Sequence, residues 1–224
     1  MRLGPLEDLP DDECARLRDL AVARRWQPGE WLYRAGDVAD RLYVVQSGVV
    51  AIQAPGGDAA GVTFALLGED ELFGEVAFLG ARRRTAGVVA VSECETVSLS
   101  LDAVAAVAQR SVAAVEALMA VMADTIRRLS AQLVEARVDP QPVRLRRLLA
   151  RLPRLFDSPR APLTHDRIAQ LIGARRTTVS ELLATEAAAG RIRTGRGWIE
   201  VLDERALRDI AQGTQPTPAP AARR

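Results

Sequence analysis

Short apolar segments separated by glycine-containing turns fill the chain between residues 25 and 101. Gly-Glu and Gly-Asp pairs at 29–30, 36–37 and 68–69 punctuate segments such as WLYRAGD and RLYVVQSGVVAI. Strand-length apolar runs bounded by turn residues are typical of antiparallel sheets. We therefore expect a compact β-roll or barrel here, preceded by a short helical segment at residues 10–23.

The hydrophobic period changes to that of a helix between residues 111 and 138. Apolar side chains recur alternately four and three residues apart, at Val115, Met119, Met122, Ile126, Leu129 and Leu133. This spacing is the a/d seam of a two-stranded coiled coil. A long helix lying on its own β-domain would produce much the same stripe. We favour a dimer seam, because the predicted helix joins two domains and is nearly unbroken.

Prolines mark the end of the long helix. Asp139-Pro140 stops it and Pro142 follows, since proline cannot continue a helix and favours extended geometry in the residue before it. Residues 139–142 are therefore the predicted hinge. Another helix is expected from residue 143, with leucines on one side and arginines on the other.

Two short helices that meet at a glycine are predicted between residues 163 and 183. Gly173 can take the left-handed conformation that ends the first helix, and small Ala169 lets the two helices approach closely. These features favour a helix-turn-helix over an ordinary helical hairpin in a larger fold. The inward-facing residues are Ile168, Leu171 and Ile172 in the first helix, and Val179, Leu182 and Leu183 in the second.

The polar side of the second helix carries side chains suited to DNA. Arginine forks and hydroxyl groups contact phosphates and base edges. A hairpin with a Gly-Arg-Gly tip at residues 195–197 follows, as in the wing of a winged helix, although a plain β-hairpin would expose its arginine equally. The predicted contacts to double-stranded DNA are Arg175, Arg176, Thr177, Thr178, Ser180, Glu181 and Arg196.

The distribution of charge supports a polyanionic partner for one half of the chain. The net charge is +1, and every basic residue is arginine. Residues 1–136 carry 13 Arg and 20 acidic residues, a net charge of −7, whereas residues 137–224 carry 17 Arg and 9 acidic residues, a net charge of +8. Such asymmetry suggests that only the C-terminal half binds a polyanion.

Composition argues against several classes of protein. With 48% apolar and 26% charged residues, the 224-residue chain has the composition of a globular protein. It has no apolar run near the roughly 18 residues of a membrane helix and no signal-peptide core, so we expect a cytoplasmic protein. Cys14 and Cys94 form no CxxC pair and His165 is the sole histidine. We therefore expect no metal site and no tightly bound cofactor.

Residues 73–90, FGEVAFLGARRRTAGVVA, combine the residue types that hold a sugar phosphate. Gly74 allows close backbone approach, Glu75 can accept hydrogen bonds from sugar hydroxyls, and Arg84 can bind a phosphate through its fork. Thr85 adds a hydroxyl and a backbone amide. A β-turn in which Glu75 and Arg84 pair with each other fits the same residues equally well.

The order of these features resembles the bacterial catabolite activator (CRP/FNR) family of transcription factors. The similarity covers roughly residues 10–205, and its most specific elements are RLYVVQSG, FGEVAFL followed by RTA, and IAQLIGARRTTVSELL. The resemblance implies an α+β fold in five parts: a cyclic-nucleotide-binding β-roll at 1–110, a dimerisation helix at 111–138, a hinge at 139–142, a winged helix-turn-helix at 143–212 and a disordered tail at 213–224.

The resemblance also implies site residues. Glu75 would hold the ribose 2′-hydroxyl, Arg84 and Thr85 the cyclic phosphate, and Gly74 would supply backbone. Arg82 and Arg83, next to the phosphate site, are expected to form a solvated turn.

The resemblance implies a homodimeric transcription regulator. It would bind cyclic AMP and a two-fold symmetric operator, and it would contact RNA polymerase. One alternative is a family member that responds to a different ligand or acts without a cyclic nucleotide. The alternatives outside the family are an enzyme that uses Glu75 with Arg84, and an interaction module without DNA binding.

Two regions depart from the family pattern. Cyclic-AMP receptors place a hydroxyl pair on the long helix, one from each subunit, where this chain has Leu129-Ser130. Ser130 can still bond to the adenine but Leu129 cannot, and one lost bond costs about 1–3 kcal/mol, or roughly 5- to 150-fold in affinity.

In the recognition helix, Thr177 and Glu181 stand where the family's best-known pattern has a glutamate and an arginine. Arg176 can still take guanine O6 and N7 in a bidentate pair, and Thr178 can hold a phosphate. Each altered contact changes base discrimination by about 1–3 kcal/mol. The operator should therefore differ from the family's usual TGTGA half-site.

Overall fold

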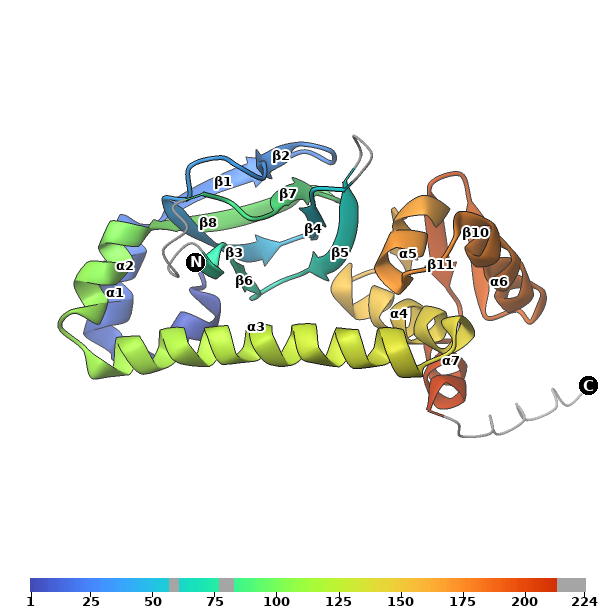
Figure 1. The fold of residues 1–224 in the computed structure, drawn as a ribbon. Coiled ribbons are helices and arrows are strands. Elements are labelled where there is room, and N and C mark those ends of the chain that lie inside the picture. The colour runs from blue at the N-terminus through green and yellow to red at the C-terminus, as the bar shows by residue number, and fades with distance from the viewer. Residues whose placement is uncertain (57–60, 77–82, 213–224) are drawn as a thin grey trace, which may run out of the picture. The chain divides into compact units, whose positions relative to one another are not determined.

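The computed structural model describes residues 1–56, 61–76 and 83–212. Contacts divide the chain into two compact units, Met1–Leu133 and Val134–Arg224. In Figure 1 the described residues of the first run from blue to yellow-green, and those of the second from yellow to red. Within the described ranges, no helix combines the length and hydropathy needed to cross a membrane. Arg82 and the tail at 213–224, for which a solvated turn and disorder were predicted, lie outside these ranges.

Two four-stranded antiparallel sheets form the predicted β-roll of the first unit (Figure 1). One sheet has the strand order β1 (Val22–Trp26), β8 (Cys94–Ser100), β3 (Arg41–Ser47) and β6 (Leu72–Phe73). The other has the order β2 (Trp31–Tyr33), β7 (Gly87–Ala90), β4 (Val50–Ala54) and β5 (Val62–Leu67). Apolar side chains from strands of both sheets fill the interior of the roll, among them Trp26, Val45, Val50, Phe73 and Val88.

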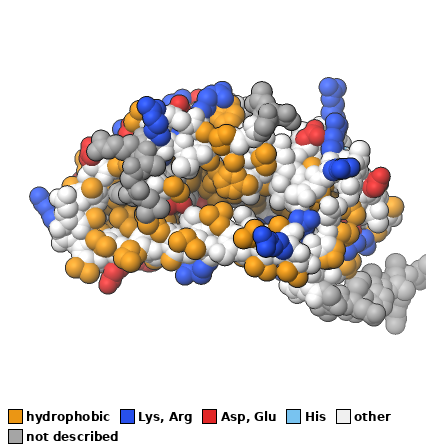
Figure 2. Space-filling model, viewed as in Figure 1, with side chains coloured by type: hydrophobic (Ala, Val, Ile, Leu, Met, Phe, Trp, Pro, Cys, Tyr) orange, Lys and Arg blue, Asp and Glu red, His pale blue; other side chains and the backbone are white. Residues whose placement is uncertain are grey.

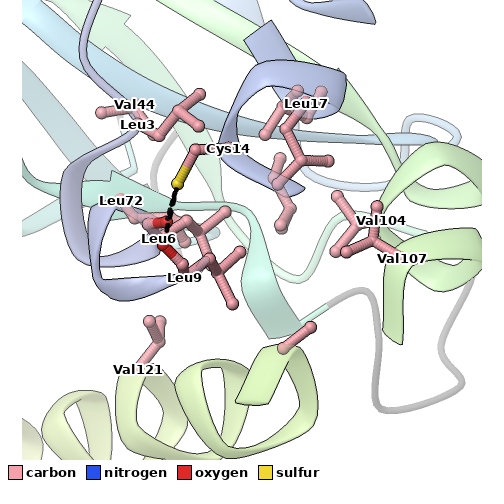
Figure 3. Close-up of a cluster of buried hydrophobic side chains, with 13 residues drawn as sticks. Leu3, Leu6, Leu9, Cys14, Leu17, Val44, Leu72, Val104, Val107 and Val121 are labelled. Carbon is pink, nitrogen blue, oxygen red and sulfur yellow. Dashed lines mark hydrogen bonds between the residues drawn. The ribbon is translucent and has the colours of Figure 1, made fainter. Parts of the chain in front are cut away.

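A second hydrophobic cluster joins the first sheet to the helices of this unit (Figure 3). The 3-10 helix η1 (Gly4–Asp8) and α1 (Asp11–Leu20) contribute Leu6, Cys14 and Leu17. The Cys14 sulfur lies 3.4 Å from the carbonyl oxygens of both Leu6 and Leu9, and either can accept its single hydrogen. α1 ends earlier than the predicted helical segment at 10–23, because the chain enters β1 at Val22.

Two further helices complete this unit. α2 (Leu101–Ala108) follows β8 directly, and its first turn is capped by the Ser100 hydroxyl, which accepts from the Ala103 amide at 3.1 Å. α3 (Val112–Val138) is a single 27-residue helix, as the apolar spacing predicted. Its buried residues Ala114 and Val121 belong to the second hydrophobic cluster.

The link between α3 and α4 (Gln141–Leu155) is shorter than the predicted hinge at 139–142. Only Asp139 and Pro140 separate the two helices. Pro142 lies in the first turn of α4, where its missing N–H has no intrahelical acceptor and its fixed φ suits the helix. The prolines therefore stop one helix and start the next within two residues.

The second unit is a winged helix-turn-helix. Its described residues form four helices after α3 and a small antiparallel sheet (Figure 1). The helices after α4 are α5 (His165–Ile172), α6 (Arg176–Ala188) and α7 (Glu204–Ala211). The sheet has the order β10 (Ile192–Gly195), β11 (Trp198–Val201) and β9 (Arg160–Ala161).

Candidate ligand and nucleic-acid sites

The backbone turn after β6 holds the predicted cassette in place. Gly74 has a φ of +88°, a conformation that other residues rarely adopt. A Cβ at this position would lie 2.8 Å from Arg84 Nη1 and 3.1 Å from the Arg41 carbonyl oxygen. The glycine thus leaves room for the guanidinium of Arg84. The predicted close approach of a ligand to this backbone stays a prediction.

Arg84 is buried, with 6% of its surface exposed. Its Nη2 donates to the Arg41 carbonyl at 2.7 Å and its Nη1 to the Gly74 carbonyl at 3.5 Å. The guanidinium carbon lies 4.1 Å from the centre of the Tyr33 ring. Arg84 Nε is buried and has no hydrogen-bond partner among the described residues. The fork is therefore held in one orientation with donor capacity left for another acceptor.

Aromatic rings form the floor on which Arg84 lies. Tyr43 and Phe73 are stacked with ring centres 5.2 Å apart, and Tyr33 is tilted against both. Burial raises the pKa of the Tyr33 phenol, and the nearby Arg84 charge only partly offsets this. Tyr33 therefore stays neutral, and its ring offers a cation–π contact rather than a counter-charge.

Glu75 is buried as well, at 7% exposure, but does not pair with Arg84. Its Oε1 accepts a hydrogen bond of 2.9 Å from the hydroxyl of Thr125 on α3. Arg84 instead uses backbone carbonyls. The β-turn alternative, in which the two charges neutralise each other, is therefore not what the structure has.

The other residues around the cassette are more exposed. Thr85 is exposed, next to the buried Arg84. Arg83 is also exposed, as predicted, but its Nη1 donates to the Gly36 carbonyl at 2.8 Å and its backbone bridges to Val38. Arg83 is thus a fixed part of the turn rather than a freely solvated side chain.

Among the described residues, the α3 hydroxyl that bonds to the cassette is that of Thr125. The prediction for Ser130 concerns a different contact, with the adenine of a bound nucleotide. Ser130 is exposed. Five residues of α-helix turn a side chain by about 140°, so the two hydroxyls point to different sides of α3. Sequence comparison by position missed Thr125. The helical spacing from Ala114 to Val121 and on to Thr125, three residues that face the same unit, could have indicated it.

The predicted seam lies on a different face of α3 from the residues that pack on the β-roll. Met119 and Ile126 are each 64% exposed. Val115, Leu129 and Leu133 are also exposed, and Met122 is half-buried. Figure 2 shows hydrophobic side chains recurring along this helix. The helix therefore carries two stripes: one covers its own unit, and the seam is uncovered in the single chain.

The helix-turn-helix has the turn that the sequence predicts. Thr164 caps α5 by accepting from the Arg167 amide at 3.2 Å, and Gly173 ends it with a φ of +61°. Ile168, Ile172, Val179 and Leu183 are buried between the helices, while Leu171 and Leu182 are half-buried. The polar residues at the start of α6 are left facing outward.

Most predicted DNA contacts are accessible. Arg175, Arg176, Thr177, Glu181 and Arg196 are exposed, and Thr178 is half-buried. Arg196 stands with Gly197 at the tip between β10 and β11, where Gly197 has a φ of +79°. The arrangement gives one helix start and one hairpin tip with accessible arginines, which suits phosphate and base-edge contacts.

Two predicted contacts have partners within the unit. The Ser180 hydroxyl lies 2.9 Å from Nδ1 of His165, so it joins α5 to α6. Arg176 Nε lies 3.4 Å from an Asp166 carboxylate oxygen, and both side chains are more than half exposed. Such an exposed pair contributes only about 0–1 kcal/mol, less than the roughly 1–3 kcal/mol of a bidentate arginine–guanine contact. Asp166 can therefore orient Arg176 without preventing base recognition.

A buried ion cluster fixes α6 within its unit. Glu186, 2% exposed, accepts from Arg146 Nε of α4 at 2.7 Å and from Arg191 Nε at 2.5 Å. A carboxylate with two arginine partners can remain charged in the interior. Glu186 was not predicted from the sequence. The residues predicted on α6 as functional were the polar ones on its outward face.

The described residues contain no cluster of side chains that could hold a metal ion. Cys14 and Cys94 are both buried free thiols. Burial raises the pKa of Cys94 to about 11, which keeps it protonated and unreactive near neutral pH.

Each of the two units matches a known protein family. Residues 23–111 match the cyclic nucleotide-binding domain, and residues 143–210 match the Crp-like helix-turn-helix domain. The chain is 33% identical over 199 residues to the cyclic AMP receptor protein of Thermus thermophilus, covering 87% of this chain and 92% of the relative. It is 30% identical over 186 residues to a CRP-like cAMP-activated global transcriptional regulator of Mycobacterium tuberculosis, covering 77% and 83%.

Solved structures give the same similarity. The catabolite activator protein of Thermus thermophilus aligns with 94% of this chain and 99% of its own, with a TM-score of 0.52 and 30% identity. A putative CRP/FNR-family regulator from Eubacterium rectale aligns with 93% of this chain and 98% of its own, with a TM-score of 0.75 and 15% identity.

Proposed function

The chain belongs to the CRP/FNR family of DNA-binding transcription regulators, and from this membership we propose that its operator affinity is controlled by cyclic AMP bound in the β-roll. The observation that carries the proposal is the pair of buried, opposite charges at Glu75 and Arg84, which do not neutralise each other. Among the described residues, each of the two has hydrogen-bond partners but no counter-charge, and a buried charge without a counter-charge is costly. A ribose hydroxyl at Glu75 and a cyclic phosphate at Arg84 would satisfy both.

Several residues support a nucleotide as the ligand. Gly74 and the aromatic floor fix the Arg84 fork, and Thr85 offers a hydroxyl beside it. Ser130 is exposed beside the seam of α3, and we propose that it reaches the adenine in the partner subunit's site. Leu129 offers no hydrogen bond, so we expect weaker adenine recognition than with a hydroxyl pair.

The exposed seam of α3 supports a homodimer. Apolar side chains with the alternating spacing of a two-stranded coiled coil stand uncovered along the helix. A dimer would present two recognition helices, which must be about 34–36 Å apart to enter successive major grooves of a two-fold symmetric operator. We infer that cyclic AMP re-aims them through α3 and the link at Asp139 and Pro140, to the extent that it binds one arrangement better than the other.

The remaining partners follow from this role. The protein would act in the cytoplasm, where its DNA lies, and would contact RNA polymerase at the promoter. No catalytic function is proposed for Glu75 and Arg84, because the family consists of transcription regulators.

Titration calorimetry tests the effector. We expect heat of binding from cyclic AMP, and we expect Arg84→Ala to weaken binding at least tenfold, since it removes the phosphate fork. Arg83→Ala is the matched control: it removes an exposed neighbouring arginine and should change affinity less than threefold. No heat from cyclic AMP at millimolar concentration would refute cyclic AMP as the effector.

A second candidate function, regulation by a different ligand or by none, is favoured by Leu129 alone. Selection of bound genomic DNA fragments with and without cyclic AMP separates the two. Equal enrichment in both conditions would favour the second candidate, and enrichment only with cyclic AMP would favour the first.

A further inference from the structure

We propose that Thr125 is a positioning residue for effector recognition, because it holds one oxygen of Glu75 so that the other faces the ribose. The inference rests on the proposed function and adds a residue to the same site. Its basis is the 2.9 Å hydrogen bond from the Thr125 hydroxyl to Glu75 Oε1. Glu75 Oε2 has no hydrogen-bond partner among the described residues and can accept from a sugar hydroxyl.

A chain of hydrogen bonds sets the direction of the Thr125 contact. Arg128, one turn further along α3, donates Nη2 to the Thr125 oxygen at 3.3 Å. A hydroxyl has a single hydrogen to donate. With the arginine N–H directed at its oxygen, the hydrogen of Thr125 is left for Glu75.

Arg128 is itself fixed from the β-roll. Its Nη1 donates to Glu71 Oε1 at 2.8 Å, and Glu71 Oε2 accepts from the Gly68 amide at 2.7 Å. The turn before β6 therefore orients Arg128, Arg128 orients Thr125, and Thr125 orients the carboxylate after β6. Connected hydrogen bonds of this kind strengthen one another in partly buried surroundings.

The Glu75 carboxylate would therefore accept two hydrogen bonds, one from Thr125 of α3 and one from the ribose. Glu75 has little freedom to accept both partners in any other geometry, because it is 7% exposed. Loss of the Thr125 hydroxyl would leave Oε1 without its donor and the carboxylate without a fixed rotamer. We expect this to weaken the ribose contact specifically, and to leave the phosphate contact at Arg84 in place.

The test compares Thr125→Val with wild type in binding cyclic AMP and its 2′-deoxy analogue. Valine keeps the branched shape and removes the hydroxyl. We expect about 10- to 150-fold weaker binding of cyclic AMP, a fold-change corresponding to one hydrogen bond to a charged group. For 2′-deoxy cyclic AMP we expect wild type and Thr125→Val to bind equally, since the contact that Thr125 supports is absent. Thr125→Ser, which keeps the hydroxyl, should restore cyclic AMP binding to within threefold of wild type.

The outcomes separate this inference from the proposed function. Unchanged cyclic AMP affinity in Thr125→Val would overturn the inference and leave the effector proposal intact. An equal loss for both nucleotides would also overturn it, because Thr125 would then support the fold of the site rather than the ribose contact. Failure of wild type to bind either nucleotide would overturn both.

Discussion

Single residues in the cassette are constrained by backbone geometry as much as by chemistry. Gly74 and Gly29 have almost the same φ, +88° and +87°, but different surroundings. A Cβ at Gly74 would meet Arg84 Nη1 and the Arg41 carbonyl oxygen, whereas a Cβ at Gly29 would meet nothing within 4 Å. The two positions therefore separate the cost of the backbone conformation from the cost of the contact with Arg84.

Gly74→Ala is expected to destabilise the protein by about 2–4 kcal/mol and to abolish cyclic AMP binding, because alanine strains the backbone and displaces the Arg84 fork. Gly29→Ala should cost only about 1 kcal/mol and leave binding unchanged. Urea unfolding followed by fluorescence, together with calorimetry, measures both effects. Equal stability losses in the two variants would contradict the predicted contact with Arg84.

At the scale of elements, two faces of the helix α3 have different surroundings. One face carries Ala114, Val121 and Thr125 against the β-roll, and another carries the exposed seam. The apolar spacing alone left open whether the stripe faces the chain's own domain or a partner. In the structure one face of α3 packs on its own unit, and the seam residues named from the sequence lie on another face, where all are exposed except the half-buried Met122. The dimer seam stays a prediction.

Ile126→Glu is expected to convert the proposed dimer to a monomer, since it places a carboxylate at the centre of the apolar seam with no basic partner across it. Ala131→Glu is the matched control, because it adds the same charge to an exposed position on a different face of α3. Sedimentation velocity should give a monomer for the first variant and a dimer for wild type and the control. A dimer of unchanged affinity in Ile126→Glu would place the interface elsewhere.

Periodicity and turn residues predicted the β-roll, α3 and the helix-turn-helix, because these elements have long or strongly punctuated patterns. α2 was missed because Ser100 both ends β8 and caps the helix, so no glycine or proline separates the two. The sequence also predicted Glu75 and Arg84 as site residues from their chemistry, and the structure shows both of them buried. Thr125 was missed because its role depends on which side of α3 meets the cassette, and position in the sequence alone does not give that.

At the scale of the whole molecule, the two halves of the chain differ in charge. The acidic N-terminal half carries the ligand cassette, and the arginine-rich half carries the helix-turn-helix. A protein that places arginines on DNA phosphates releases the counterions bound there. This release increases affinity independently of the DNA sequence. We expect the acidic half to contribute little to this gain, so the salt dependence of binding should depend mainly on arginines of the second unit.

Operator affinity is therefore expected to fall roughly 10³- to 10⁵-fold between 50 and 200 mM salt, if the dimer neutralises on the order of 6–10 phosphates.

The variant Arg196→Ala removes an arginine at the hairpin tip. It should make the plot of log affinity against log salt less steep, by about 1 for each phosphate that is no longer neutralised. Arg25→Ala is the control, because it removes an exposed arginine of the first unit whose ion pair is with Glu95. Fluorescence anisotropy with a labelled operator gives all three slopes. A flat profile for wild type would contradict a phosphate-dominated interface, and equal slopes for wild type and Arg196→Ala would remove the hairpin tip from it.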